Sequence, residues 1–266
     1  MYDRYNRKLN YLRISVTDRC NLRCRYCMPE EGIRLVRHED ILSYDEIAGF
    51  TGVAVKKGIN KVRITGGEPL VRKGIVTLVS MLAEIEGIDD LSMTTNGTLL
   101  KKFAADLHSA GLQRVNISLD TVDSEKFEHI TRTGNLNDVF EGISSARESG
   151  LFPIKINCVV NESGEEEEAR AVAAFCREND LEIRYIRQMD LVNGYFSIVD
   201  GGTGGNCFLC NRLRLTANGK LKPCLFNDLE YDIRLLGNEA ALDLAAGNKP
   251  ECGSKNFSGK FYNIGG

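Results

Sequence analysis

Three cysteines near the N-terminus, Cys20, Cys24 and Cys27, are spaced C-x3-C-x2-C. Three thiolates in such a short segment can bind three irons of a cubic iron–sulfur cluster and leave the fourth iron without a protein ligand. An open iron can bind a small molecule and pass an electron to it. Zinc is the alternative, but zinc sites usually have four ligands and C-x2-C pairs. The spacing therefore favours a [4Fe–4S] cluster with one open corner.

A second set, Cys207, Cys210 and Cys224, is spaced C-x2-C-x13-C. Taken alone, this spacing indicates zinc or a redox pair, with zinc favoured. Disulfides are not expected, because the chain has nine cysteines, shows no export signal and, at 266 residues, can build a core without crosslinks. These features predict a reducing, cytoplasmic setting.

A glycine-rich segment, Gly66-Gly67-Glu68-Pro69, follows a β-rich run at 61–65. Two glycines allow the backbone to approach a ligand closely, and Glu68 offers a carboxylate for an ammonium group. An ordinary strand-to-helix turn is the alternative interpretation when the segment is considered by itself.

Basic residues recur at predicted strand positions. Lys61 and Arg63 alternate, so they share one face of their strand, and the same holds for Arg212 and Arg214. Three further strands carry Arg13, Lys155 and Arg184. A single lysine or arginine is most often a solvated surface residue. A set of seven inside a barrel is harder to dismiss, because the charges would repel one another without compensation.

The elements that must position these residues alternate along the chain. Strands are predicted at 12–16, 61–65, 91–95, 114–119, 154–160 and 182–189, and helices at 43–57, 78–85, 99–110, 124–131, 136–149 and 165–179. This order predicts an α/β fold, a partial (βα)6 TIM-like barrel with a parallel sheet inside and helices outside. The cysteine triplet follows the first strand, at the end of the barrel where active sites lie.

The pattern changes after residue 190. Residues 200–206 are glycine-rich, 212–216 and 220–224 are predicted to form a hairpin around Asn218-Gly219, and the polar segment 247–266 is predicted to be irregular. We therefore expect a barrel over 1–190 and a small C-terminal region over 191–266.

The composition fits a soluble globular protein, with 42% hydrophobic and 27% charged residues. No apolar run is long enough to span a membrane. The net charge of −3 gives no general attraction to nucleic acid. Anionic ligands must therefore be bound by local clusters of basic residues.

The first cysteine motif, with Gly-Gly-Glu-Pro downstream, resembles that of radical S-adenosylmethionine enzymes. The run from Cys207 to Phe226 and the terminal Ile264-Gly265-Gly266 are similar to one family within that group, the GTP 3′,8-cyclases of molybdenum cofactor biosynthesis. The resemblance covers nearly the whole chain. It implies two [4Fe–4S] clusters, the second held by Cys207, Cys210 and Cys224, with S-adenosylmethionine as cofactor.

The same resemblance implies roles for individual residues. It places Tyr26, Gly67, Glu68, Ser118 and Met189 at the cofactor. It places the seven basic residues and Thr94 at GTP, and Arg13, Arg212, Arg214, Gly265 and Gly266 in catalysis. For Met189 the alternative is core filling, and for the glycine tail it is a frayed terminus.

The implied reaction converts GTP to (8S)-3′,8-cyclo-7,8-dihydroguanosine 5′-triphosphate. A deoxyadenosyl radical abstracts the ribose 3′ hydrogen, and the sugar radical attacks C8 of guanine. The second cluster orients the base. A reductant protein and a downstream pterin-forming enzyme are the expected partners, and a homodimer is compatible with the sequence.

Two departures from the family keep other hypotheses open. The chain is short between the sixth strand and Cys207, and it has an extra cysteine, Cys252, which is either a buried thiol or a fourth ligand of the second cluster. Cys158 and Cys176 are predicted to lie in the core. The alternatives to a cyclase are a radical maturase of a peptide or other substrate, and a non-catalytic iron–sulfur or zinc module.

Overall fold

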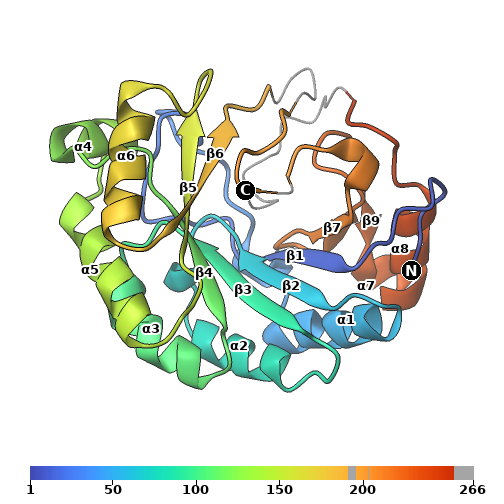
Figure 1. Cartoon of the computed structure of the whole chain (residues 1–266). Helices are drawn as coiled ribbons and strands as arrows, with labels where there is room; N and C mark the ends of the chain where they lie inside the picture. Colours follow the sequence, from blue (N-terminus) through green and yellow to red (C-terminus); the bar gives the residue numbers. More distant parts are fainter. Residues whose placement is uncertain (191–195, 203, 255–266) are drawn as a thin grey trace.

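The computed structural model describes residues 1–190, 196–202 and 204–254, and in it strands alternate with helices (Figure 1). The strands are β1 (Tyr11–Ser15), β2 (Lys61–Thr65), β3 (Asp90–Thr95), β4 (Arg114–Ser118), β5 (Lys155–Val160) and β6 (Glu182–Arg187). The helices are α1 (Tyr44–Lys56), α2 (Ile75–Ala83), α3 (Leu100–Ser109), α4 (Ser124–Thr131), α5 (Leu136–Glu148) and α6 (Glu167–Glu178). Three short 3-10 turns are η1 (His38–Asp40), η2 (Pro69–Val71) and η3 (Cys207–Leu209).

The C-terminal part of the chain extends the same sheet. It contains β7 (Arg212–Leu215), β8 (Lys220–Lys222), β9 (Tyr231–Asp232), α7 (Ile233–Leu236) and α8 (Asn238–Gly247). The described strands form one sheet in the order β6-β5-β4-β3-β2-β1-β7-β8-β9. β1 to β7 are parallel, and β8 and β9 pair antiparallel. β7 thus covers the edge of β1 that the barrel leaves open.

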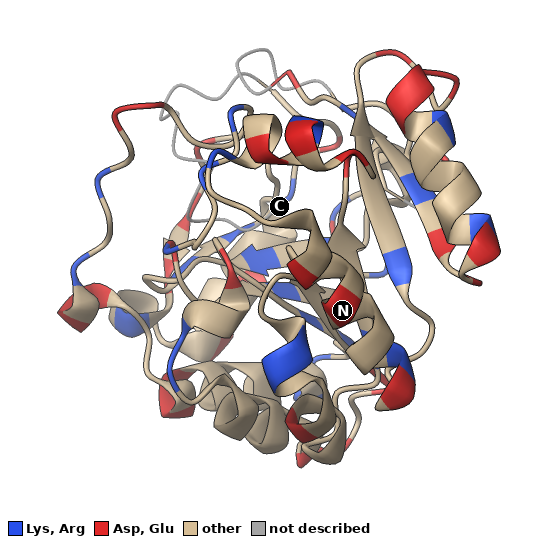
Figure 2. Ribbon diagram, turned by 90° about the vertical axis from the view of Figure 1, so that its left-hand side faces the viewer, with Lys and Arg blue, Asp and Glu red and all other residues tan. Residues whose placement is uncertain are grey.

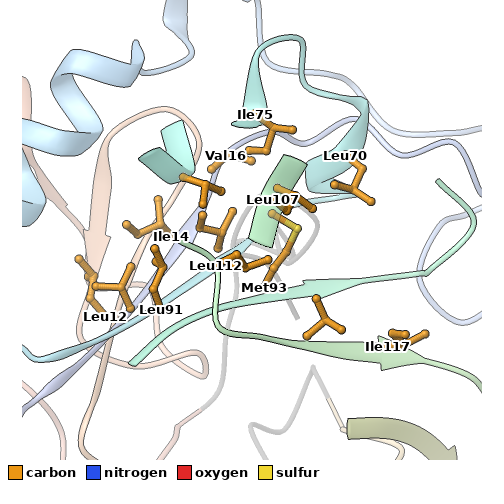
Figure 3. Packing of buried hydrophobic residues seen from close by; sticks show 14 of the residues in the cluster. Leu12, Ile14, Val16, Leu70, Ile75, Leu91, Met93, Leu107, Leu112 and Ile117 are labelled. Carbon is orange, nitrogen blue, oxygen red and sulfur yellow. The ribbon is translucent and has the colours of Figure 1, made fainter. Parts of the chain in front are cut away.

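The sheet curves and carries helices on its outer side, as Figure 1 shows. Apolar side chains of the strands meet the helices there, and Figure 3 shows part of this core, with Leu12 and Ile14 of β1 near Leu91 and Met93 of β3. Helix ends follow local sequence signals. At α1, for example, Ser43 accepts a hydrogen bond from the Glu46 N–H at 3.1 Å, and the Glu46 carboxylate accepts one from the Ser43 N–H at 2.7 Å.

The opposite face of the sheet is polar because side chains alternate along each strand. In β1, the side chains of Leu12 and Ile14 lie in the core, so those of Tyr11 and Arg13 lie on the opposite face of the sheet. The strand register then lines up basic residues, with Arg13 opposite Arg63 of β2 on one side and opposite Arg214 of β7 on the other. Tyr11 lies likewise between Lys61 and Arg212. The fold therefore places two adjacent rows of basic residues inside the barrel.

The expected partial barrel with a parallel sheet is confirmed, and most predicted elements match within three residues. The sixth strand ends at Arg187, so Met189 follows it rather than ending it. The predicted hairpin exists, but β8 stops at Lys222 and Cys224 lies after it. Helices α7 and α8 were not predicted. In the segment 247–266, which was expected to be irregular, residues 248–254 follow α8 without a helix or strand, and residues 255–266 lie outside the described residues. The two-part division at residue 190 stays a prediction.

Candidate active site

The first cysteine triplet lies in the loop that follows β1. Cys20 and Cys24 are half-buried, and Cys27 is exposed. The carbonyl of Cys24 accepts hydrogen bonds from the N–H groups of Cys27 and Met28, at 3.1 and 2.9 Å. The last two cysteines therefore share one tight turn at the strand ends, where the sequence predicted them.

The end of α4 holds this loop in place. Arg132, with a φ of 64°, turns back and donates hydrogen bonds to the carbonyls of Arg23 at 2.6 Å and Met28 at 3.0 Å. Arg25 donates to the carbonyl of His129 at 2.8 Å. Sequence reasoning missed these anchors, because nothing in the spacing of the motif refers to a helix more than a hundred residues away.

The chemistry of the cysteine triplet fits a cationic cluster. Burial raises the pKa of Cys24 to about 12, with a further contribution from the charges of Cys27 and Cys20, and burial also raises the pKa of Cys20 and Cys27. Thiolates in such a loop need positive charge, which iron supplies. In the described part of the chain, no three His, Cys, Asp or Glu side chains converge on a single metal ion. A cubane does not need such convergence, since each cysteine binds a different iron.

Gly66 and Gly67 bring the loop after β2 against the cysteine loop. The Gly67 N–H donates to the carbonyl of Thr17 at 2.7 Å. A Cβ on Gly67 would lie 2.4 Å from the carbonyl oxygen of Arg19, and one on Gly66 would lie 2.7 Å from that of Thr17. Both positions therefore need glycine. In the structure, the close approach is to the backbone of the cysteine loop.

Glu68 is a buried carboxylate, 1% exposed. It accepts hydrogen bonds from the N–H groups of Leu70 at 3.1 Å and Asn96 at 2.7 Å, and from the hydroxyl of Thr95 at 2.8 Å. Burial raises its pKa to about 7, against the lowering effect of these donors. The side-chain amide nitrogen of Asn96 also lies 3.9 Å from the sulfur of Cys20. Glu68 thus joins the end of β3 to the cysteine loop, a role that the motif alone did not reveal.

Tyr26 donates a hydrogen bond from its hydroxyl to Asp120 at 2.8 Å, and Asp120 in turn accepts one from the N–H of Val159 at 2.8 Å. Asp120 was not among the predicted site residues. Ser118 ends β4 and lies opposite Asn157 of β5. A role of Tyr26 and Ser118 at the cofactor stays a prediction.

A cavity of about 280 Å³ lies on the polar face of the sheet, and we call it the arginine cavity. Predicted residues on its wall are Arg13, Lys61, Arg63, Arg184, Met189, Arg212 and Arg214. The wall also contains Tyr11, Asp90, Arg114 and Asn157, which sequence reasoning missed. Asn157 is in register with Ser118, so the cavity reaches the row of the predicted cofactor residues.

Positive charge dominates the arginine cavity. Asp90 is the one carboxylate among the described wall residues, and Arg114 binds it at 2.6 and 3.0 Å. Burial, then the neighbouring Arg214, hold the pKa of Arg13 well below its usual value. Burial and Arg212 lower that of Arg214 to about 10. Figure 2 shows Lys and Arg along inner strands and Asp and Glu mostly on outer helices and loops. A bound polyanion would relieve this repulsion.

Four predicted substrate or catalytic residues need separate comment. Lys155 is not on the cavity wall, and its ammonium forms an ion pair with Glu182. Thr94 is also off the wall, and its buried hydroxyl has no hydrogen-bond partner among the described residues. Gly265 and Gly266 lie outside the described residues.

The second cysteine set lines a smaller cavity of about 70 Å³, which we call the auxiliary cradle. Cys207, Cys210 and Cys224 are half-buried on its wall. Although burial raises the pKa of Cys210, the ammonium of Lys249 and then Arg212 hold it below its ordinary value. The donor set suits a metal cluster, since a cation beside a sulfur favours the thiolate that binds metal.

Lys249 connects the two chain segments that form the auxiliary cradle. It is 1% exposed, and its ammonium donates to the carbonyls of Arg212 at 2.8 Å and Pro223 at 2.5 Å. It also hydrogen-bonds the sulfur of Cys210. These two segments carry the cysteines on either side of the β7–β8 hairpin. No sequence signal marked Lys249, because one lysine near the C-terminus resembles many others.

The remaining cysteines were predicted with mixed success. Cys158 and Cys176 are buried in the core, as expected. Cys252 is exposed rather than a buried thiol, so that interpretation is wrong. It does not line the auxiliary cradle among the described residues, although its thiol interacts with that of Cys207.

Comparisons with known proteins show the family to which the chain belongs. The family model of the radical SAM superfamily matches residues 14–176, and the chain belongs to that superfamily. A [4Fe–4S] cluster and S-adenosylmethionine are therefore its cofactors.

The GTP 3′,8-cyclase of Thermodesulfovibrio yellowstonii is 45% identical over 88% of this chain and 87% of its own. That of Moorella thermoacetica is 43% identical over 88% and 86%. The chain is a member of the GTP 3′,8-cyclase family.

Solved structures support the fold. Streptococcus suis SuiB is similar over 91% of this chain with a TM-score of 0.64 and 17% identity, and the chain covers 66% of it. The alignment with the T. yellowstonii relative runs over 280 residues, more than the 266 of this chain, so that relative has residues that this chain lacks.

In the described residues, no helix is both long and apolar enough to cross a membrane.

Proposed function

We propose that the chain converts GTP to (8S)-3′,8-cyclo-7,8-dihydroguanosine 5′-triphosphate in molybdenum cofactor biosynthesis. The observation that carries this proposal is the shared wall of two cavities. Phe196, Arg212, Arg214 and Leu225 line both the arginine cavity and the auxiliary cradle. One molecule can therefore place an anionic end among arginines and another end beside the second cysteine set.

The triphosphate belongs in the arginine cavity. Forked guanidinium groups match phosphate oxygens, and they lie here in adjacent register positions on β2, β1 and β7. The Nε atoms of Arg13 and Arg184 are buried and have no hydrogen-bond partner among the described residues. These donors are available to a ligand. Arg63 differs, because its Nε already donates to the hydroxyl of Ser92 at 3.3 Å.

The guanine base belongs at the auxiliary cradle. Cys207, Cys210 and Cys224 would hold a second [4Fe–4S] cluster, which supplies an open iron to the purine when bound. Lys249 keeps the two cysteine segments together, and the guanidinium groups of Arg212 and Arg214 stand at the border between base and phosphates. In this arrangement they stabilise negative charge that develops on the substrate.

The cofactor belongs at the strand ends, next to Cys20, Cys24 and Cys27. A cluster held by these cysteines would supply the electron that cleaves S-adenosylmethionine. Glu68 fixes the loop that faces the cofactor, Tyr26 lies beside the cysteines, and Ser118 and Met189 complete its surroundings. Roles for Thr94, Lys155, Gly265 and Gly266, and partnership with a reductant protein and a pterin-forming enzyme, stay predictions.

Anaerobic turnover tests this function. Reconstituted protein is incubated with dithionite, S-adenosylmethionine and GTP, and deoxyadenosine and nucleotides are followed by chromatography and mass spectrometry. We expect GTP to be consumed together with formation of deoxyadenosine. Formation of deoxyadenosine while GTP stays intact would instead support a maturase of another substrate. No cofactor cleavage under any reductant would support a non-catalytic module.

A pair of variants tests the substrate site. Arg63→Met removes one guanidinium of the arginine cavity, and loss of a charge-assisted contact of about 2 kcal/mol raises the KM for GTP roughly 30-fold. Arg170→Met is the matched control, because Arg170 is an exposed partner of Glu165 on the outer helix α6. An equal change in both variants would contradict the assignment.

A further inference from the structure

Cys252 forms a close pair with a cysteine of the auxiliary cradle. Its thiol interacts directly with that of Cys207, although 44 residues separate the two in the sequence. Cys252 is exposed, whereas Cys207 is half-buried on the wall of the cradle. Cys207 thus lines the cradle and also contacts an exposed thiol.

Arg7 holds this pair together. One of its terminal nitrogens donates to the carbonyls of Cys207 at 2.6 Å and Glu251 at 2.8 Å, and the other donates to the carbonyl of Pro250 at 2.6 Å. Its Nε binds Asp3 at 2.6 Å. Arg7 is only 8% exposed. A single buried guanidinium therefore fixes both segments that carry the two thiols, so their proximity is a built feature of the fold.

The position of Cys252 argues against a role as fourth cluster ligand. The described wall of the auxiliary cradle includes Cys207, Cys210 and Cys224 and does not include Cys252. A cluster ligand must face the cluster. An exposed thiol beside a ligand cysteine is placed instead to react with the ligand when no cluster occupies it.

We propose that Cys207 and Cys252 form a reversible disulfide that competes with metal binding at the auxiliary cradle. The oxidant is a low-molecular-weight disulfide. The Cys252 thiolate attacks it, forms a mixed disulfide and releases one small thiolate. The Cys207 thiolate then attacks the sulfur of Cys252 and releases the second, so two thiols are oxidised while one small disulfide is reduced to two thiols.

This disulfide has a clear consequence for cluster assembly. A sulfur bonded to sulfur cannot bind iron, so the oxidised pair blocks the cradle, and reduction opens it again. The pair also protects Cys207 from further oxidation while the cradle is empty. The disulfide itself does not depend on the proposed reaction with GTP, but its role in assembly rests on the second cluster proposed above.

Disulfide mapping of cluster-free protein tests the pair. The apo-protein is incubated with glutathione disulfide, and its peptides are mapped without reduction by tandem mass spectrometry. We expect a Cys207–Cys252 link that Cys252→Ser abolishes and Cys210→Ser retains. The Cys210→Ser control is needed because Cys207 and Cys210 share one tryptic peptide. A Cys207–Cys210 link, or glutathione adducts without a crosslink, would overturn the proposal.

Two further measurements separate a redox pair from a cluster ligand. The reconstituted Cys252→Ser variant should keep about eight irons and the electron paramagnetic resonance signals of the wild type. A loss of iron or a changed signal would make Cys252 a ligand and refute the proposal. Arg7→Lys should slow crosslinking at least tenfold in apo-protein, since a lysine cannot bridge the two segments. These readouts need no GTP or S-adenosylmethionine, so they can fail or succeed independently of the proposed reaction.

Discussion

The buried carboxylate of Glu68 should make the stability of the protein depend on pH. Burial raises its pKa from 4.5 to about 7 in the folded protein. One pKa unit corresponds to about 1.4 kcal/mol, so the ionised group costs about 3 kcal/mol once it is fully charged. The folded state binds the proton more tightly than the unfolded state. Below about pH 4.5 Glu68 is protonated in both states and does not change the free energy of unfolding with pH. As pH rises from 4.5 to about 7, the free energy of unfolding falls.

Glu68→Gln removes this dependence. The free energy of unfolding is measured in urea, on cluster-free protein under reducing conditions, at pH 5 and pH 8. At pH 5 the variant should be less stable by about 1–2 kcal/mol, because an amide cannot accept from all three donors. Between pH 5 and pH 8 the wild type should lose about 2.5 kcal/mol more than the variant, because part of the full loss falls below pH 5.

The control for this experiment is Glu86→Gln, which changes an exposed glutamate at the end of the same βα unit. The control should follow the pH profile of the wild type. If Glu68→Gln and the wild type showed parallel profiles, the burial argument for Glu68 would be refuted.

Three further changes test the architecture of the two cysteine sites. Lys249→Met removes the donor to one buried and one partly buried carbonyl, so it should lower stability by about 2–4 kcal/mol and remove iron from the second cluster only, as iron analysis with Mössbauer spectroscopy would show. Gly67→Ala places a Cβ against the carbonyl of Arg19 and should cost about 1–3 kcal/mol in urea unfolding and reduce loading of the first cluster. Tyr26→Phe loses the hydrogen bond to Asp120 and should cost about 1 kcal/mol without changing iron content. Unchanged unfolding curves in all three variants would contradict the packing described for these loops.

The sequence predicted the barrel well because its strands and helices have regular hydrophobic periods. Alternation placed Lys61 with Arg63 and Arg212 with Arg214 on shared faces, and both pairs lie on the wall of the arginine cavity. Residue type could not show which basic side chains are already paired. Lys155 binds Glu182 outside the cavity, while Arg114 lies on its wall and was missed.

Long-range tertiary contacts limited the rest of the prediction. Arg132, Lys249 and Arg7 act through backbone carbonyls far away in the sequence, and any residue can offer a carbonyl. No local pattern therefore marks them. Helix α7 was missed because it has only four residues, and α8 was missed because its apolar and polar residues alternate too weakly to show a helical period.

The parallel pairing of β7 with β1 has a consequence for how the chain reaches its folded state. During synthesis, β1 emerges first, but its outer edge acquires a neighbour only when residues 212–215 have left the ribosome. Until then that edge offers free backbone groups to any extended segment nearby. Nascent chains should be most prone to self-association in this interval, and a protein truncated before Arg212 would keep that hazard permanently.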